Sequence, residues 1–257
     1  MLQYEMESQG NVLFRWRSYL PLIILIGGLA VYANTQFKIK AGIVDAMPFS
    51  FDLICLAIAT FGLLIRIYTV GHTPKNTSGR NTAEGQVADE VNTTGIYSIV
   101  RHPLYVGNFF MWLGPAMYTA DIWFTISFIM LYYVYYERIM YAEEQFLVGK
   151  FGDIYASWSK VTPAFIPSFK NWNTAQLGFS WKKIIKKEKN GLFAMFLVFF
   201  IFHASGEYIQ GGTLSDKDFW LTGTMKFWTY GTVISGIIYF ILKYIKKYTK
   251  VFDEEGR

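Results

Sequence analysis

The sequence has few of the residues that build redox or metal centres. Its 257 residues include one cysteine, Cys55, and three histidines, His72, His102 and His203. A single cysteine excludes an intrachain disulfide framework, and histidines this far apart in sequence give no zinc-ligand spacing. Charge is scarce as well, because only 17% of residues are charged while 53% are hydrophobic and 19% are aromatic. This composition is too apolar for an ordinary soluble domain and indicates a membrane protein.

The apolar runs predict an all-α integral membrane protein with about six transmembrane helices, each needing about 20 mostly apolar residues. The runs cover residues 18–37, 53–70, 104–120, 122–136, 191–206 and 219–242. The third and fourth are short and are separated by Asp121, so we expect a tight helical hairpin with Pro115 near its turn.

We therefore expect a single membrane domain over residues 1–257. Residues 18–70 hold the first two spans, and residues 191–257 hold the last two spans and a tail. Residues 71–190 hold the hairpin and the long polar connections on either side of it, which contain the three polar segments described below. An N-terminus in the cytoplasm puts about 20 of the 24 lysines and arginines on the cytoplasmic side, a strong positive-inside bias. Both termini are then cytoplasmic. The basic residues adjoin apolar spans, so they indicate neither nucleic-acid binding nor an obligate protein partner.

The first polar segment, residues 72–82, is rich in glycine, serine and asparagine. It carries Lys75, Asn76, Arg80 and Asn81. Backbone N–H groups and two cations in such a stretch suit an anion, and phosphate is the natural guest. A solvated loop beside the membrane explains the same residues equally well.

The second polar segment, residues 95–107, runs directly into the third apolar run. Pro103 is placed where a helix begins, so the exposed N–H groups of that helix lie beside Arg101. Such a site suits a carboxylate or a phosphate. The alternative is an Arg101–His102 pair that anchors the helix at the membrane interface.

The third polar segment continues the fourth apolar run as a helix past the membrane surface. Glu137 and Glu144 are seven residues apart and share a helix face, whereas Glu143 is rotated by about 100° from Glu144. One adjacent carboxylate pair can therefore point in two directions. The alternative is a solvated helix on which Arg138 and the glutamates form weak surface ion pairs.

An ordered set of motifs runs through these segments: Arg101-His102-Pro103-Leu104-Tyr105, then Glu143-Glu144, then the stretches 151–155 and 162–167. In this order and spacing the set resembles the membrane methyltransferase family of isoprenylcysteine carboxyl methyltransferases and phospholipid methyltransferases, over residues 95–167. The resemblance implies a cytoplasmic-facing pocket for S-adenosylmethionine and no metal. By matching position, the cofactor would be held by Tyr97, His102, Tyr105, Gly107, Glu144 and Phe165. Arg101 and Glu143 would face the methyl acceptor as catalytic residues.

A narrower resemblance adds the stretches 75–82, 92–95 and 169–172. These are similar to the bacterial branch of the family that methylates a phosphate of lipid A. The resemblance implies O-methylation of a lipid A phosphate at the cytoplasmic leaflet of a bacterial inner membrane. The acceptor would be bound by Arg66, Lys75, Asn76, Arg80, Asn81 and Arg138.

The alternatives divide by the acceptor and by the class of protein. A phosphate oxygen is already anionic at neutral pH and needs no strong base, whereas an amine acceptor would need one, for which Glu143 is the candidate. Phospholipid N-methylation and isoprenylcysteine carboxyl methylation therefore stay open. A non-catalytic lipid-binding scaffold or a small transporter is the alternative of another class. Transporters usually place ionisable residues in mid-membrane, and here His203 alone lies well inside a run, where we expect it to hydrogen-bond between helices.

Overall fold

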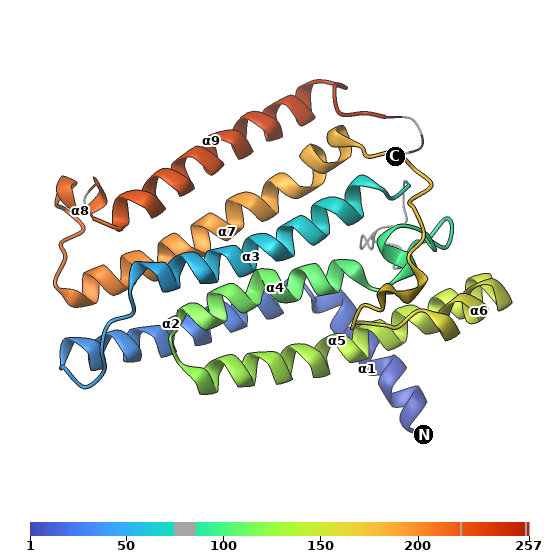
Figure 1. Ribbon diagram of the computed structural model, residues 1–257, viewed down its shortest axis with the longest axis horizontal. Coiled ribbons are helices and arrows are strands. Elements are labelled where there is room, and N and C mark those ends of the chain that lie inside the picture. Colours follow the sequence, from blue (N-terminus) through green and yellow to red (C-terminus); the bar gives the residue numbers. More distant parts are fainter. Residues whose placement is uncertain (75–85, 222, 255, 257) are drawn as a thin grey trace.

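A computed structural model describes residues 1–74, 86–221, 223–254 and 256, and within these ranges the regular elements are all helices (Figure 1). The all-α expectation is therefore confirmed. The α-helices are α1 (Leu2–Trp16), α2 (Leu20–Lys40), α3 (Phe49–Gly71), α4 (Pro103–Tyr118), α5 (Ile122–Phe151), α6 (Asp153–Val161), α7 (Trp181–Gln210), α8 (Lys217–Leu221) and α9 (Met225–Tyr248). Two single-turn 3₁₀ helices, η1 (Ile96–Ser98) and η2 (Phe169–Asn171), lie in the connections.

Four of the described helices are long and apolar enough to cross a membrane. They are Pro21–Lys40 within α2, then α3, α7 and α9, and they contain most of four of the predicted runs. These helices make the chain an integral membrane protein. The remaining two runs form α4 and the first half of α5, which lie antiparallel as a hairpin (Figure 1). Asp121 begins α5 by accepting a hydrogen bond from the Phe124 backbone N–H at 2.8 Å. A membrane crossing by this pair, and hence a total of six spans, stays a prediction.

Two helix boundaries and one additional helix differ from the sequence expectation. The last long helix begins at Met225, because residues 217–221 form the separate short helix α8. Helix α7 begins at Trp181, so the lysine-rich stretch before residue 191 is helical and continuous with the span. Lysine is a good helix former, and the buried Lys183 Nζ donates to the Thr73 hydroxyl at 3.0 Å, so the extension is compatible with these lysines. Helix α1 was not predicted, since its few apolar residues form no membrane-length run.

Helices α3 and α4 approach closely, and this contact determines where the polar ends of both helices lie. A Cβ atom added at Gly62 would lie 2.4 Å from the Gly107 backbone oxygen, and one added at Gly114 would lie 2.4 Å from the Cys55 backbone oxygen. Only glycine permits such distances, as in other tightly packed membrane helices. The first turn of α4 is thereby held beside the last turns of α3.

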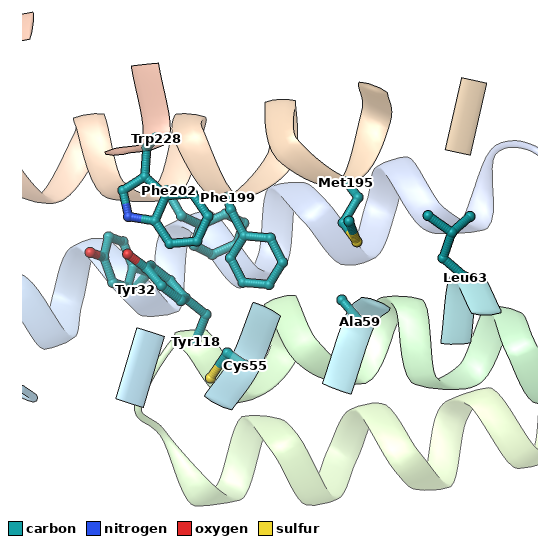
Figure 2. Close-up of a cluster of buried hydrophobic side chains, with 9 residues drawn as sticks. All are labelled: Tyr32, Cys55, Ala59, Leu63, Tyr118, Met195, Phe199, Phe202 and Trp228. Carbon is teal, nitrogen blue, oxygen red and sulfur yellow. The ribbon is translucent and has the colours of Figure 1, made fainter. Parts of the chain in front are cut away.

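The main core lies between α2, α3, α4, α7 and α9 and is rich in aromatic rings (Figure 2). Trp228 is fully buried and stacks on Phe199 with ring centroids 5.2 Å apart. Many large apolar side chains on the outer helix faces are exposed, such as Ile23, Leu64 and Ile234. Exposed apolar surface on the long helices suits a lipid environment. His203 hydrogen-bonds between helices as expected, with Nδ1 2.7 Å from the Tyr118 hydroxyl and Nε2 2.9 Å from the Thr224 hydroxyl.

Candidate functional site

A pocket of about 440 Å³ opens at the end of the bundle where α3 ends and α4 and α7 begin. Its walls also include α1, the start of α2, residues 86–92, the polar half of α5 and helix α6. The volume lies within the usual range of small-molecule sites. The second and third polar segments singled out in the sequence therefore meet around one hollow, whereas residues 72–74 of the first are not among its lining residues.

The segment before α4 is held in place by backbone hydrogen bonds. Pro103 begins α4, where its missing N–H costs nothing and its fixed φ favours the helix. The N–H of Arg101 donates to the Pro163 carbonyl at 2.9 Å, and the N–H of His102 donates to the Ala164 carbonyl at 3.2 Å. Residues 101–105 and 162–167, two of the stretches on which the family resemblance is based, thus lie side by side.

Arg101 forms a two-bond ion pair with Glu144. Its Nε donates to Glu144 Oε1 at 2.9 Å and its Nη2 donates to Oε2 at 3.1 Å. Its Nη1 donates to the backbone oxygens of Ser159 and Thr162 at 2.5 and 2.7 Å. This guanidinium therefore ties α5, α6 and the start of α4 together.

His102 lies between the two adjacent glutamates. Its Nε2 is 2.9 Å from Glu144 Oε1, and its Nδ1 is 3.5 Å from Glu143 Oε2. Burial lowers the pKa of His102, but hydrogen bonds and charges from Glu143 and Glu144 outweigh burial, so the pKa is raised above 6.5. Burial raises the pKa of Glu144, yet His102 and Arg101 outweigh it and lower that pKa. Both shifts favour an imidazolium between two carboxylates.

Glu143 faces the pocket, whereas Glu144 lies behind it. The hydroxyl of Tyr105 donates to Glu143 Oε2 at 3.0 Å, and both residues line the hollow. Glu144 is not among the lining residues. The two carboxylates thus point in different directions, as their helical spacing predicted.

The other sequence-predicted residues divide between the pocket and its surroundings. Tyr97 and Arg66 line the pocket, but Gly107, Phe165 and Arg138 do not. Gly107 faces Arg66, Phe165 packs against the ring of Phe109, and Arg138 lies 3.6 Å from Glu137 on α5. The predictions for Lys75, Asn76, Arg80 and Asn81 fall outside the described residues.

Sequence reasoning missed Glu188, which lies inside the lysine-rich stretch of α7. Arg66 Nε and Nη2 donate to its two carboxylate oxygens at 2.9 and 2.8 Å, and Arg66 Nη1 donates to Asn108 Oδ1 at 2.7 Å. Glu188 is only 4% exposed. A single acidic residue among lysines at a membrane edge was the available signal. The lysines around it predict membrane topology and contact with anionic headgroups, and neither interpretation involves Glu188.

Arg17 and Lys187 also line the pocket and were likewise interpreted as topology residues. Arg17 lies at the end of α1, with its guanidinium 3.9 Å from the centre of the Phe14 ring. Because α1 was not predicted, nothing in the sequence placed Arg17 beside the motifs of α4 and α5.

Several pocket residues carry buried polar atoms that have no hydrogen-bond partner among the described residues. Among them are the side-chain oxygens of Gln86 and Tyr155 and the indole nitrogen of Trp158. A buried polar group left without a partner costs about 1–3 kcal/mol. These atoms are therefore suited to a polar ligand that enters the pocket with a small side-chain adjustment.

Comparison with known proteins supports the resemblance seen in the motifs. Residues 53–154 match the family model of phospholipid methyltransferases. The chain is 41% identical over 76 residues to a protein-S-isoprenylcysteine O-methyltransferase of Schizosaccharomyces pombe, covering 29% of this chain and 32% of that protein. It is 32% identical over 83 residues to a cobalt-zinc-cadmium resistance protein of Cupriavidus metallidurans and to a nickel-cobalt-cadmium resistance protein of Alcaligenes xylosoxydans, covering 32% of this chain and 38% of each relative.

These matches are partial, since the chain spans about a third of the length of the curated relatives it matches. No solved structure matches the chain significantly. The matched family segment nevertheless contains most of α3, the whole of α4 and α5 and the residues Arg101, His102, Glu143 and Glu144. Over this segment the chain is similar to phospholipid methyltransferases and to an isoprenylcysteine methyltransferase.

Proposed function

We propose that this protein transfers a methyl group from S-adenosylmethionine to a lipid at the cytoplasmic leaflet. The observation that carries the proposal is the convergence of Arg101, His102, Glu143 and Glu144 beside one pocket, inside the segment that matches the family. A pocket at one end of a membrane bundle suits a soluble donor and a lipid acceptor. The donor enters from the aqueous side and the acceptor enters from the bilayer.

The chemistry of the pocket fits this cofactor. Gln86, Tyr155 and Trp158 have one amide acceptor, one hydroxyl and one indole donor without partners in the described part of the chain, which suits a ligand with amino, hydroxyl and carboxylate groups. Glu143 and Glu90 are lining carboxylates that can accept hydrogen bonds from hydroxyl or amino groups. The N-terminus of α4 at Pro103 favours a carboxylate. When bound, the cofactor supplies an electrophilic methyl group on a sulfonium centre.

The side chains around the pocket then act mainly by position. Glu144 holds Arg101 and His102, and His102 in turn faces Glu143, so the pocket wall is braced before any ligand enters. Tyr97 and Tyr105 present ring surface to the hollow, which suits a sulfonium or an aromatic base. Displacement at a methyl carbon chiefly requires alignment and the exclusion of water. We therefore propose positioning roles for Glu144 and His102 and direct ligand contact for Glu143.

For the acceptor we propose an acidic headgroup, with a lipid A phosphate as the preferred member. The support is the cationic stretch that contains Lys75 and Arg80, together with Arg17 and Lys187 in the described pocket wall. Arg66 is bound by Glu188, so its proposed contact with the acceptor depends on N–H groups that this pair leaves available. On this proposal the enzyme resides in a bacterial inner membrane with both termini in the cytoplasm.

The carboxylate of a prenylated cysteine is a second candidate acceptor. It is favoured by the 41% identity to the isoprenylcysteine methyltransferase. A carboxylate and a phosphate are both anionic oxygen nucleophiles, so the same cations serve either. An amine headgroup would gain little from them.

Two measurements test the proposal. Purified protein in nanodiscs should bind S-adenosylhomocysteine saturably by calorimetry, and a folded sample that shows no binding would contradict methyl transfer. Incubation with methyl-labelled S-adenosylmethionine and separate pools of lipid A, phosphatidylethanolamine and a prenylcysteine then identifies the acceptor. Label only in phosphatidylethanolamine would exclude the anionic acceptors.

A further inference from the structure

A second cavity, of about 360 Å³, lies at the opposite end of the bundle from the first pocket. It is bounded by the ends of α2, α4 and α7, the start of α3 and Thr224 just before α9. The methyl-transfer proposal uses none of its residues. Its polar wall contains Asp52, His203, Glu207, Tyr32 and Tyr118. We call it the distal cavity.

The distal cavity has an acidic lining. Asp52 and Glu207 contribute two carboxylates, and among the described residues no lysine or arginine lines the cavity. His203 does not satisfy either carboxylate, because its Nδ1 is 3.6 Å from Asp52 Oδ2 and its Nε2 is 3.6 Å from Glu207 Oε1. Both ring nitrogens are instead within hydrogen-bond distance of hydroxyls, those of Tyr118 and Thr224. The carboxylates therefore keep hydrogen-bond acceptors available.

The two carboxylates differ in how they are held. Asp52 accepts a hydrogen bond from the Tyr118 hydroxyl at 3.1 Å and is 15% exposed. The Glu207 side chain is 44% exposed, and its carboxylate accepts no hydrogen bond from a described residue. Asp52 thus provides a fixed acceptor in the wall, and Glu207 provides an adjustable one near the mouth.

Aromatic rings form much of the remaining wall. Tyr32 and Tyr118 lie 5.6 Å apart between ring centroids, and Phe49 and Phe51 line the cavity beside Asp52. Ring faces beside carboxylates are the chemistry that recognises an organic ammonium ion. A metal ion suits the cavity less well, since no group of three or more histidine, cysteine or acidic side chains in the described part of the chain could hold one.

A buried polar atom without a partner in the described part of the chain lies behind two of the lining residues. Trp228 is fully buried, and its indole nitrogen has no hydrogen-bond partner among the described residues. The Trp228 ring is 6.1 Å from the Tyr118 ring and 6.1 Å from the His203 ring, and both of these residues line the cavity. Figure 2 shows the indole nitrogen at the same end of the cluster as the hydroxyl oxygens of Tyr32 and Tyr118. A ligand oxygen could satisfy this donor after a small shift.

We propose that the distal cavity binds a small organic ammonium ion that carries a neighbouring oxygen, as an amino alcohol does. The ammonium group would lie between Asp52 and Glu207, and the tyrosine rings would flank it. The oxygen would face the inner wall near Trp228. The same chemistry occurs in a free amino alcohol and in the headgroup of an aminolipid. The proposal does not depend on methyl transfer at the first pocket.

Ethanolamine is the probe, and ethylene glycol is its uncharged control of similar size. The full chain is placed in nanodiscs of phosphatidylglycerol or of phosphatidylethanolamine, and binding is followed by saturation-transfer NMR. In phosphatidylglycerol we expect a saturable ethanolamine signal and none from ethylene glycol. A signal that disappears in phosphatidylethanolamine identifies the aminolipid headgroup as the occupant, whereas a signal in both lipids identifies a free amine.

Three variants link the signal to the cavity. Asp52→Asn and Glu207→Gln should each weaken ethanolamine binding by about tenfold, the usual loss when a charge-assisted hydrogen bond is removed. Asp45→Asn removes a carboxylate from the α2–α3 connection without touching the cavity lining and should change nothing. Glu207→Gln keeps the test valid if Asp52→Asn does not fold, since the Glu207 side chain is 44% exposed against 15% for Asp52. Absence of an ethanolamine signal in phosphatidylglycerol, or equal binding by wild type and Glu207→Gln, would overturn the proposal.

Discussion

Replacement of Glu144 by alanine is the sharpest test of how the first pocket is built. The substitution removes both carboxylate oxygens from Arg101 and one from His102. Arg101 keeps its two backbone acceptors, but its guanidinium and the His102 imidazolium are left side by side. Both groups are largely buried, because the Arg101 side chain is 16% exposed and the His102 side chain is 7% exposed. Breaking a buried ion pair costs 3–5 kcal/mol, and some access to water puts the expected loss near the low end, about 3 kcal/mol.

The cost should appear in both stability and ligand binding. Because Arg101 and His102 brace the pocket wall, we expect Glu144→Ala to lose at least tenfold in affinity for S-adenosylhomocysteine, measured by calorimetry. Unfolding in detergent, followed by circular dichroism, should show the loss of stability. Glu144→Gln retains hydrogen-bonding capacity without the charge and should fall between wild type and alanine.

Glu137→Ala is the matched control on the same face of α5. Glu137 is 42% exposed and lies 3.6 Å from Arg138, so its removal should cost at most about 1 kcal/mol. If folded Glu144→Ala bound S-adenosylhomocysteine within twofold of the wild-type affinity, Glu144 would not brace the pocket wall. A loss as large in Glu137→Ala would show that the helix, and not the pocket, had been damaged.

Three further predictions concern the other charged groups. Folding raises the pKa of His102, so the stabilisation from its ion pairs is fully present below pH 6.5 and is lost as the pH rises through the raised pKa. The difference in unfolding free energy between wild type and His102→Asn should therefore become smaller as the pH rises. In a double-mutant cycle, Arg66→Ala and Glu188→Ala should show coupling of about 1–3 kcal/mol in unfolding free energy. Arg80→Ala should raise the KM for the lipid acceptor several-fold and leave S-adenosylhomocysteine binding unchanged.

Each of these predictions has an outcome that would contradict it. A constant stability gap between pH 5 and pH 9 would show that His102 does not gain protons on folding. Additive losses in the Arg66 and Glu188 cycle would show that their close contact contributes no coupling. If Arg80→Ala weakened cofactor binding as much as acceptor binding, the first polar segment, residues 72–82, would contact the cofactor.

The membrane character and most helix positions could be predicted from the sequence, because they depend on local composition. Long apolar runs mark α2, α3, α7 and α9, and Asp121 marks the start of α5 as a capping residue. The boundaries around residues 181–191 and 217–225 could not be predicted. A lysine-rich stretch is compatible both with a solvated connection and with a helix whose lysines keep their charges in water.

Composition alone predicted an α-helical membrane protein, and the order of its motifs produced the resemblance to a methyltransferase family that implied one site for Arg101, His102, Glu143 and Glu144. Tertiary structure alone decided the pairing: Arg101 with Glu144 across 43 residues and Arg66 with Glu188 across 122. Partners so far apart in sequence meet only when whole helices pack, as α3 and α4 do through Gly62 and Gly107. The distal cavity and the position of α1 in the pocket wall also depend on how whole helices pack. No local sequence pattern predicts either of them.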